Sequence, residues 1–338
     1  MTQFSRQELL EKVTRAIKDL QYNPQPANLY APINYVLSLG GKRLRPILML
    51  MAYNLYKEDV DSILQNAIGL EMYHNFTLLH DDLMDKAEMR RGKDCVHKKW
   101  NDNTAILSGD TMLILAYRLF TEHRTNDNSS VQITTNSETE NQALRTFTEA
   151  TLGVCEGQQY DMEFETRNDV TVDEYLNMIQ LKTSVLLAGA AKIGAQLAGA
   201  DEADAQALYE YGLKMGLAFQ LQDDLLDVYG DPTIFGKQIG GDILCNKKTF
   251  MIINALNLAN QEQKAQLTSW INATSYVPES KIKAVTDIYN AIGIKKLAEE
   301  KIEAYFNESL NMLDKVKVDK CKKIHLKEFA HWLMGRKY

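Results

Sequence analysis

Apolar positions recur with a helical period over most of the chain. Within residues 67–84 they are spaced by four, three and four residues, at Met72, Phe76, Leu79 and Leu83. This spacing places them on one face of an α-helix. Stretches of the same helical character cover residues 174–199, 205–229, 250–269, 281–314 and 322–335. No run of alternating positions bounded by turn residues indicates a β-hairpin, so the pattern predicts an all-α protein.

Three segments interrupt the helical pattern. Residues 38–46 contain two glycines and a proline, residues 124–142 are polar and rich in Asn, Ser and Thr, and residues 230–248 combine glycines with lysines. Such residues mark turns and loops. Because helical patterning resumes after each segment, none resembles an interdomain linker. We therefore expect one domain over residues 1–338, with a mobile polar loop or helix-joining insertion at 124–142.

Composition narrows the class of protein. Hydrophobic residues make up 45% of the 338 positions and charged residues 25%, which favours an ordered chain with a sizeable core. The net charge of -7 argues against general nucleic-acid binding. Any anion site must therefore be a local basic cluster.

No targeting or membrane segment is evident. The N-terminal 20 residues carry charges throughout, and the most apolar long stretch, 183–200, contains Lys192 and Gln196. We therefore expect neither a signal peptide nor an integral membrane segment. The four cysteines are far apart and form no CxxC pair, which favours neither a zinc site nor a disulfide framework. A reducing cytoplasm is the simplest compartment.

Two carboxylate clusters stand out within apolar helical stretches. The first is DDLMD at 81–85, in which Asp81 and Asp85 share a helix face, and His74 lies on nearly the same face. The second is DDLLD at 223–227, preceded at helical spacing by Gln220. Like charges at this spacing destabilise a helix unless a cation compensates them. One such motif alone could equally be a solvated acidic face, but two favour Mg²⁺ shared with a substrate phosphate.

Basic residues beside glycines accompany both acidic clusters. Three groups occur, at Lys42, Arg43 and Arg45; at Arg90, Arg91 and Lys93; and at Lys237, Lys247 and Lys248. Arg offers paired donors to a phosphate and Lys a point charge, while glycine lets the backbone approach an anion closely. Together with the carboxylates, these groups predict a site that binds diphosphates.

Seven motifs, in order along the chain, resemble those of the trans-type isoprenyl diphosphate synthases, the family of farnesyl and geranylgeranyl diphosphate synthases. They are GGKRLRP at 40–46, HDDLMDKAEMRRG at 80–92, GD at 109–110, GQQYD at 157–161, KT at 182–183, FQLQDDLLD at 219–227 and GKQIGGDILCNKKT at 236–249. The resemblance implies an all-α bundle around a central cavity, usually as a homodimer. It also implies condensation of isopentenyl diphosphate with dimethylallyl, geranyl or farnesyl diphosphate, with three Mg²⁺ ions.

The resemblance assigns roles to individual residues. The isopentenyl diphosphate site is Lys42, Arg45, His74 and Arg91. The principal metal ligands are Asp81, Asp85 and Asp223, supported directly or through water by Asp82, Asp224 and Asp227. The clamp on the allylic diphosphate is Arg90, Lys182, Gln220, Lys237 and Lys247, and the residues beside the developing carbocation are Thr183 and Gln220. The tail residues Arg336 and Lys337 are expected to close over the isopentenyl site.

Product length should depend on side chains that precede the first acidic cluster. Tyr73 and Thr77 share a four-residue stripe with Asp81 and Asp85. Phe76 lies on the apolar stripe and fits either the hydrophobic core or, by resemblance, the pocket floor. Phe76 and Thr77 before an uninterrupted DDLMD resemble short-chain, archaeal-type geranylgeranyl synthases. We expect a C20 product, with C15 as the close alternative.

Two other functions share parts of this pattern. A class I terpene cyclase carries a similar first motif, but its second motif normally mixes Asn, Ser or Thr and Glu, whereas here it is DDLLD. A regulatory subunit of a heteromeric synthase tends to lose acidic motifs, and this chain keeps both. The sequence therefore favours the synthase.

Overall fold

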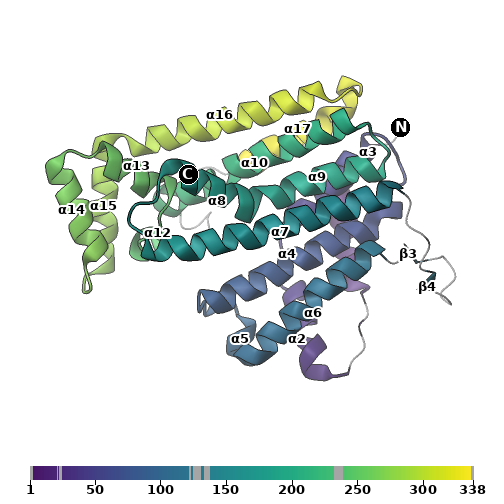
Figure 1. Cartoon of the computed structure of the whole chain (residues 1–338), viewed down its shortest axis with the longest axis horizontal. Coiled ribbons are helices and arrows are strands. Elements are labelled where there is room, and N and C mark those ends of the chain that lie inside the picture. Colours follow the sequence, from purple (N-terminus) through teal and green to yellow (C-terminus); the bar gives the residue numbers. More distant parts are fainter. Residues whose placement is uncertain are drawn as a thin grey trace. The chain divides into compact units, whose positions relative to one another are not determined.

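The computed structural model describes residues 3–20, 22, 25–121, 123–124, 131–132, 138–231 and 239–335, which are mostly helical (Figure 1). The predicted all-α class is confirmed. The chain divides into two compact units. The first comprises Met1–Phe147, Ala190–Gln206 and Val318–Leu326, and the second comprises Thr148–Gly189, Ala207–Lys317 and Lys327–Tyr338.

The first unit is built around a central helix that carries the first acidic cluster. Its helices are α1 (Arg6–Lys18), α2 (Ala27–Ser38), α3 (Leu44–Asn54), the 3₁₀ turn η1 (Val60–Ile63), α4 (Leu64–Met84), α5 (Val96–Lys99) and α6 (Asp102–Thr121). α4 packs along α6, where the His80 side chain of α4 rests against Gly109. A Cβ atom at that position would lie 2.2 Å from Nε2 of His80, so only glycine lets the imidazole rest on α6.

A buried ion pair fixes the start of α3 to α4. The guanidinium of Arg43 lies 2.6 Å from Oε1 of Glu71, and both side chains are almost fully buried. Arg43 also donates to the carbonyl of Leu37, 2.8 Å away, at the end of α2. Arg43 has a left-handed backbone, with φ of 48°. The basic residue between Lys42 and Arg45 therefore supports the fold and not a ligand.

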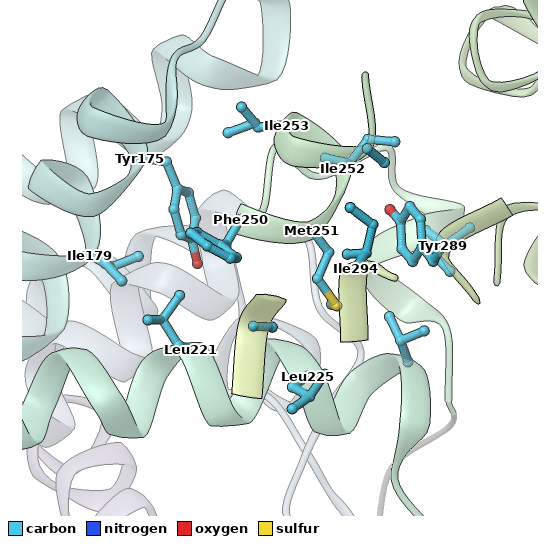
Figure 2. Packing of buried hydrophobic residues seen from close by; sticks show 14 of the residues in the cluster. Tyr175, Ile179, Leu221, Leu225, Phe250, Met251, Ile252, Ile253, Tyr289 and Ile294 are labelled. Atoms are coloured by element: carbon cyan, nitrogen blue, oxygen red, sulfur yellow. The ribbon is translucent and has the colours of Figure 1, made fainter. Parts of the chain in front are cut away.

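The second unit contains the longest helices. Its elements are α7 (Glu138–Thr166), α8 (Val172–Ile179), the π-turn η2 (Gln180–Ser184), α9 (Val185–Leu197), α10 (Glu202–Tyr229), α12 (Gly241–Leu244), α13 (Phe250–Leu258), α14 (Gln261–Asn272), α15 (Pro278–Ile292), α16 (Ile294–Lys315) and α17 (Ile324–Met334). Of these, α7, α9, α10 and α17 each have some residues in the first unit, and the 3₁₀ turn η3 (Lys320–Lys323) belongs to the first unit entirely. The buried core joins α8, α10, α13 and α15. Figure 2 shows Tyr175 and Phe250 together above Leu221 of α10, with Met251 and Tyr289 farther along.

Several helices end earlier than the hydrophobic pattern suggested. The stretch 281–314 is two helices, because Gly293 adopts a left-handed backbone with φ of 83° and ends α15. The stretch 250–269 is also divided, since α13 ends at Leu258 and Asn260 caps α14. Both breaks occur at residues that favour helix termini.

The predicted polar loop at 124–142 extends too far, because residues 138–142 belong to helix α7. α7 already begins at Glu138, where acidic residues in the first turn favour the positive end of the helix dipole. The rest of this predicted loop falls largely on 125–130 and 133–137, outside the described residues. Two short hairpins were not expected: β1 (Met89–Arg90) pairs with β2 (Lys93–Asp94), and β3 (His123–Arg124) pairs with β4 (Val131–Gln132).

Among the described residues, no helix combines the length and apolar character needed to cross a lipid bilayer.

We predict that breaking the Arg43–Glu71 pair destabilises the fold, because removing either side chain leaves the other as a buried charge without its partner. Glu71→Leu should lower the free energy of unfolding by about 3–5 kcal/mol, since it leaves a buried guanidinium without its partner. The double variant Arg43→Met/Glu71→Leu should recover most of that loss. Denaturant titration measures both.

The exposed pair of Lys12 and Asp61, 2.8 Å apart, is the matched control. Asp61→Ala should change stability by less than about 1 kcal/mol. A Glu71→Leu variant that loses no more stability than Asp61→Ala would contradict the importance of the buried pair.

Candidate active site

The first acidic cluster lies at the carboxyl end of α4. Asp81 is half-buried in the last turn, and Asp85 is the C-cap and exposed. The carbonyl end of a helix carries partial negative charge, so carboxylates there are disfavoured unless cations approach. Asp81 and Asp85 therefore form a site that favours positive charge.

Asp82 faces a different environment from its neighbours. Its carboxylate is buried and accepts a 2.7 Å hydrogen bond from Nε of Arg90. The same guanidinium lies 3.9 Å from Asp81. Arg90 thus neutralises part of the cluster, and Asp82 holds Arg90 in place beside Asp81.

A tight hairpin turn directs the two consecutive arginines. Arg90 pairs with Lys93 across the hairpin, so Arg91 and Gly92 form its two-residue turn, with φ of 53° and 73°. Two positive φ values are typical of a type I′ turn. Arg90 reaches the carboxylates, whereas Arg91 donates a hydrogen bond to the carbonyl of Gly40. The turn thereby joins the GGKRLRP and RRG motifs.

Positive charge concentrates around His74. Burial and then the charges of Arg45, Arg91, Arg90 and Arg43 hold the pKa of His74 well below its usual range, so this imidazole is neutral. Burial also lowers the pKa of Arg45 to about 10, although Glu71 opposes this. Such a concentration of cations is favourable for an anion.

Three of the four residues predicted to bind isopentenyl diphosphate are thus brought together, namely Arg45, His74 and Arg91. Nε of Arg45 is buried without a hydrogen-bond partner among the described residues. Lys42, the fourth, is exposed in the same loop. This donor set fits a diphosphate.

The second acidic cluster has one buried and two more accessible carboxylates. Asp224 accepts hydrogen bonds from the hydroxyl of Tyr175 and, at 3.1 Å, from Nε2 of Gln220. Burial, with the nearby charge of Asp242, raises the pKa of Asp224 to about 8. Asp223 is only partly buried. Asp227 accepts the backbone N–H of Asp242 at 2.9 Å.

The π-turn η2 presents Lys182 and Thr183 in the same unit. Nζ of Lys182 lies 2.6 Å from Asp161, and the hydroxyl of Thr183 donates to Gln220 at 3.0 Å. A Cβ atom at position 157 of α7 would lie 2.2 Å from the backbone nitrogen of Lys182, so Gly157 is needed for this contact. π-turns are frequent at functional sites.

Asp161 is a site residue that sequence reasoning did not assign. Burial acts to raise its pKa, but the ammonium charges of Lys247 and Lys182 outweigh that effect and lower it. The signal was present, because Asp161 ends the GQQYD motif. The carboxylate of Asp161 thus lies close to the ammonium groups of both Lys182 and Lys247.

Lys237, Arg336 and Lys337 lie outside the described residues. Asp81 and Asp85 belong to the first unit, and Asp223 and Asp227 to the second.

The described carboxylates suit a cation shared with substrate. Within the described residues, no group of three or more His, Cys, Asp and Glu side chains could hold a metal ion. Mg²⁺ commonly binds through one or two carboxylates, with waters and substrate phosphates completing its shell. Asp81 with Asp85, and Asp223 with Asp227, supply such pairs.

The predicted chain-length residues lie in an aromatic cluster of the first unit. The ring of Tyr73 is 5.4 Å from that of Phe76 and 5.7 Å from that of Phe147, and Phe76 also contacts His80. Tyr73 is fully buried and Phe76 nearly so. Thr77 donates to the carbonyl of His74 at 2.8 Å. This packing agrees with a core role and leaves the pocket-floor role as a prediction.

A family model described as polyprenyl synthetase matches residues 26–290. The chain belongs to the polyprenyl synthetase family. It is therefore an enzyme, a prenyltransferase, and the resemblance inferred from the seven motifs is confirmed. Polyprenyl synthetases use Mg²⁺.

Relatives of this polyprenyl synthetase agree in length and fold. A geranylgeranyl diphosphate synthase of Methanosarcina mazei is 37% identical over 96% of this chain and 95% of its own. A geranylfarnesyl diphosphate synthase of Natronomonas pharaonis is 38% identical over 73% of this chain and 74% of its own. A solved geranylgeranyl pyrophosphate synthase superposes with a TM-score of 0.90 at 42% identity, covering 99% of this chain and 100% of that one.

Proposed function

We propose that this polyprenyl synthetase is a short-chain synthase that condenses isopentenyl diphosphate with allylic diphosphates, with C20 geranylgeranyl diphosphate as its main product. The observation that carries the proposal is the pairing of each acidic motif with its own cluster of cations. One cluster consists of the arginines around His74, and the other consists of Lys182 and Lys247 beside Asp161. Two anion sites are what a reaction of two diphosphates requires.

Each cluster would hold one substrate. Lys42, Arg45 and Arg91, with the neutral imidazole of His74, would bind the diphosphate of isopentenyl diphosphate. Lys182, Gln220 and Lys247 would hold the allylic diphosphate, with Arg90 and Lys237 as further members by resemblance. We also propose that both units together form the single catalytic domain.

The proposed reaction breaks one bond and forms another. The allylic C–O bond breaks, and its electron pair leaves with the diphosphate. The double bond of isopentenyl diphosphate then supplies the electrons for the new C–C bond. A proton is lost from the adjacent carbon, and the released diphosphate is the proposed acceptor.

The protein's own groups would stabilise each stage. Asp81 and Asp85 in one unit, and Asp223 and Asp227 in the other, would hold three Mg²⁺ ions. When bound, these ions would supply positive charge for a leaving diphosphate, as the Lys and Arg cations do. The oxygens of Thr183 and Gln220, 3.0 Å apart, offer partial negative charge to the carbocation. Asp82 and Asp224 would act indirectly, through the hydrogen bonds by which they hold Arg90 and Gln220.

The first prediction tests the reaction and its metal sites. With Mg²⁺, the protein should convert labelled isopentenyl diphosphate and an allylic primer into longer diphosphates. Asp81→Ala and Asp223→Ala should each lower kcat by about 10²–10³-fold, the typical loss when stabilisation of developing charge is removed. Chelation should abolish turnover. Asp61→Ala, on an exposed side chain, is the control for folding. Near-normal turnover in either active-site variant would rule out the metal assignment, and a cyclised product would favour the terpene cyclase alternative.

The second prediction concerns product length. At about 1.5 Å per residue, Phe76 lies roughly 7–8 Å and Tyr73 roughly 12 Å along α4 from Asp81. Phe76→Ala and Tyr73→Ala should therefore each shift products toward longer chains, and the double variant further. Chromatography of dephosphorylated products measures this. Phe120→Leu is the control, because the described ring contacts of this cluster stack Phe120 on Phe147 and not on Tyr73 or Phe76. If all variants keep the wild-type product and merely lose stability, these rings are core packing.

The third prediction concerns assembly, which we propose to be a cytoplasmic homodimer. Support comes from α6, where Leu107 and Ile114 are 59% and 67% exposed and lie seven residues apart on one face. Two large apolar side chains on one exposed helix face would be suited to burial against a second copy of the chain. Ile114→Glu should produce monomers in sedimentation experiments, while Lys283→Glu, at an exposed position of α15, should not. A wild-type monomer at assay concentrations would exclude the dimer.

A further inference from the structure

The chain turns sharply between α12 and the lysine that follows it. α12 ends at Leu244, and Asn246 has a left-handed backbone with φ of 53°. The backbone N–H of Lys247 then donates to the carbonyl of Asp242 at 2.9 Å. Asn tolerates this conformation better than most residues. The direction in which Lys247 leaves the turn therefore depends on how the turn, residues 244–246, is held.

A buried lysine from α15 holds this turn. Lys281 is 1% exposed. Its Nζ donates to Oδ1 of Asn246 at 2.7 Å and to the carbonyl of Leu244 at 3.4 Å. Among the residues that the structure describes, it forms no ion pair, and burial lowers its pKa. Lysine is rarely buried without a partner carboxylate, so its contacts with one turn call for an explanation.

Two further contacts fix the same turn. Nδ2 of Asn246 donates to the carbonyl of Ile271 at 3.1 Å, which ties the turn to the end of α14. The hydroxyl of Tyr276 donates to the carbonyl of Leu244 at 3.1 Å, and its ring lies 4.3 Å from Nζ of Lys281. α14 and α15 thus hold residues 244–246 from two sides.

The turn leads directly to the cation cluster of the second unit. A cavity of about 20 Å³ is lined by both Lys281 and Lys247. The charge of Lys247 acts on Asp161, the partner of Lys182, and on Asp224. Lys281 itself is not near these carboxylates in any described contact. Lys281 can therefore affect the site only by way of the turn that precedes Lys247.

We propose that Lys281 is a positioning residue: by holding Leu244 and Asn246 it sets where Lys247 presents its ammonium to the allylic diphosphate. This inference rests on the proposed function for the identity of the ligand, but not for the geometry of the turn. Lys281 touches no substrate. Lys281 keeps the turn rigid just before Lys247. A displaced Lys247 ammonium would weaken ionisation of the allylic diphosphate.

Kinetics of Lys281→Met test the catalytic part. The KM for farnesyl diphosphate should rise, or kcat fall, by about tenfold or more, because small displacements of a positioned group are costly. The KM for isopentenyl diphosphate should stay within about twofold. Lys283→Met, an exposed lysine two residues along α15, is the matched control and should leave both constants unchanged.

A double-mutant cycle separates positioning from general destabilisation. In a Lys247→Ala background, Lys281→Met should change kcat/KM for farnesyl diphosphate by less than about twofold, because its effect is already lost. An undiminished effect in that background, or an equal effect on isopentenyl diphosphate, would overturn the proposal. If Lys281→Met does not fold, Tyr276→Phe should give a smaller effect in the same direction and be absorbed by the same background.

Hydrogen exchange tests the turn independently of activity. In the full chain, Lys281→Met should speed exchange of the Lys247 amide by about tenfold or more, whereas Lys283→Met should not. Unchanged exchange would overturn the proposal even in an active enzyme. If the wild-type protein makes no product, but Lys281→Met still speeds exchange of the Lys247 amide, the proposed function is refuted and the positioning role stands.

Discussion

The structure depends on keeping like charges close together in a folded chain. Carboxylates gather at the negative end of α4, and guanidinium groups gather around a neutral imidazole a few residues away. Each group is unfavourable alone. The fold compensates them locally, through Arg90 on Asp82, Glu71 on Arg43 and Lys182 on Asp161. Each of these pairs joins a cation to a carboxylate, so the like charges are held close together without remaining a burden on the fold.

This arrangement explains why adjacent residues in one motif behave differently. Asp81 and Asp82 are neighbours, yet one stays half-exposed and the other is buried under Arg90. In the second motif, Asp224 is buried beneath Tyr175 while Asp223 is partly exposed. Helical geometry separates them by about 100°. In each pair, one carboxylate is buried and hydrogen-bonded, and the other is more accessible.

The sequence was sufficient for the helical class, because the apolar period is a local property. Carboxylate spacing and basic clusters are local as well, and from them the sequence predicts the candidate site residues. Arg43 could not be told from Lys42 and Arg45, since its partner Glu71 lies 28 residues away. Lys281 was equally hidden, because its contacts with Leu244 and Asn246 cross more than 30 residues. The division of 281–314 at Gly293 was missed because the apolar period continues on both sides of it. Long-range pairing and backbone reversal are thus what the pattern alone could not supply.

The π-turn has a consequence for how this chain can vary. An α-helix advances about 100° per residue, and a turn closed by i to i+5 bonds contains one residue more than an α-helical turn. Everything after Ser184 in α9 is therefore rotated relative to α8 by that one residue. Deleting a residue between Gln180 and Ser184 would restore a regular helix while moving Lys182 and Thr183 out of step with Asp161 and Gln220. At this point, the length of the segment matters as much as the identity of its side chains.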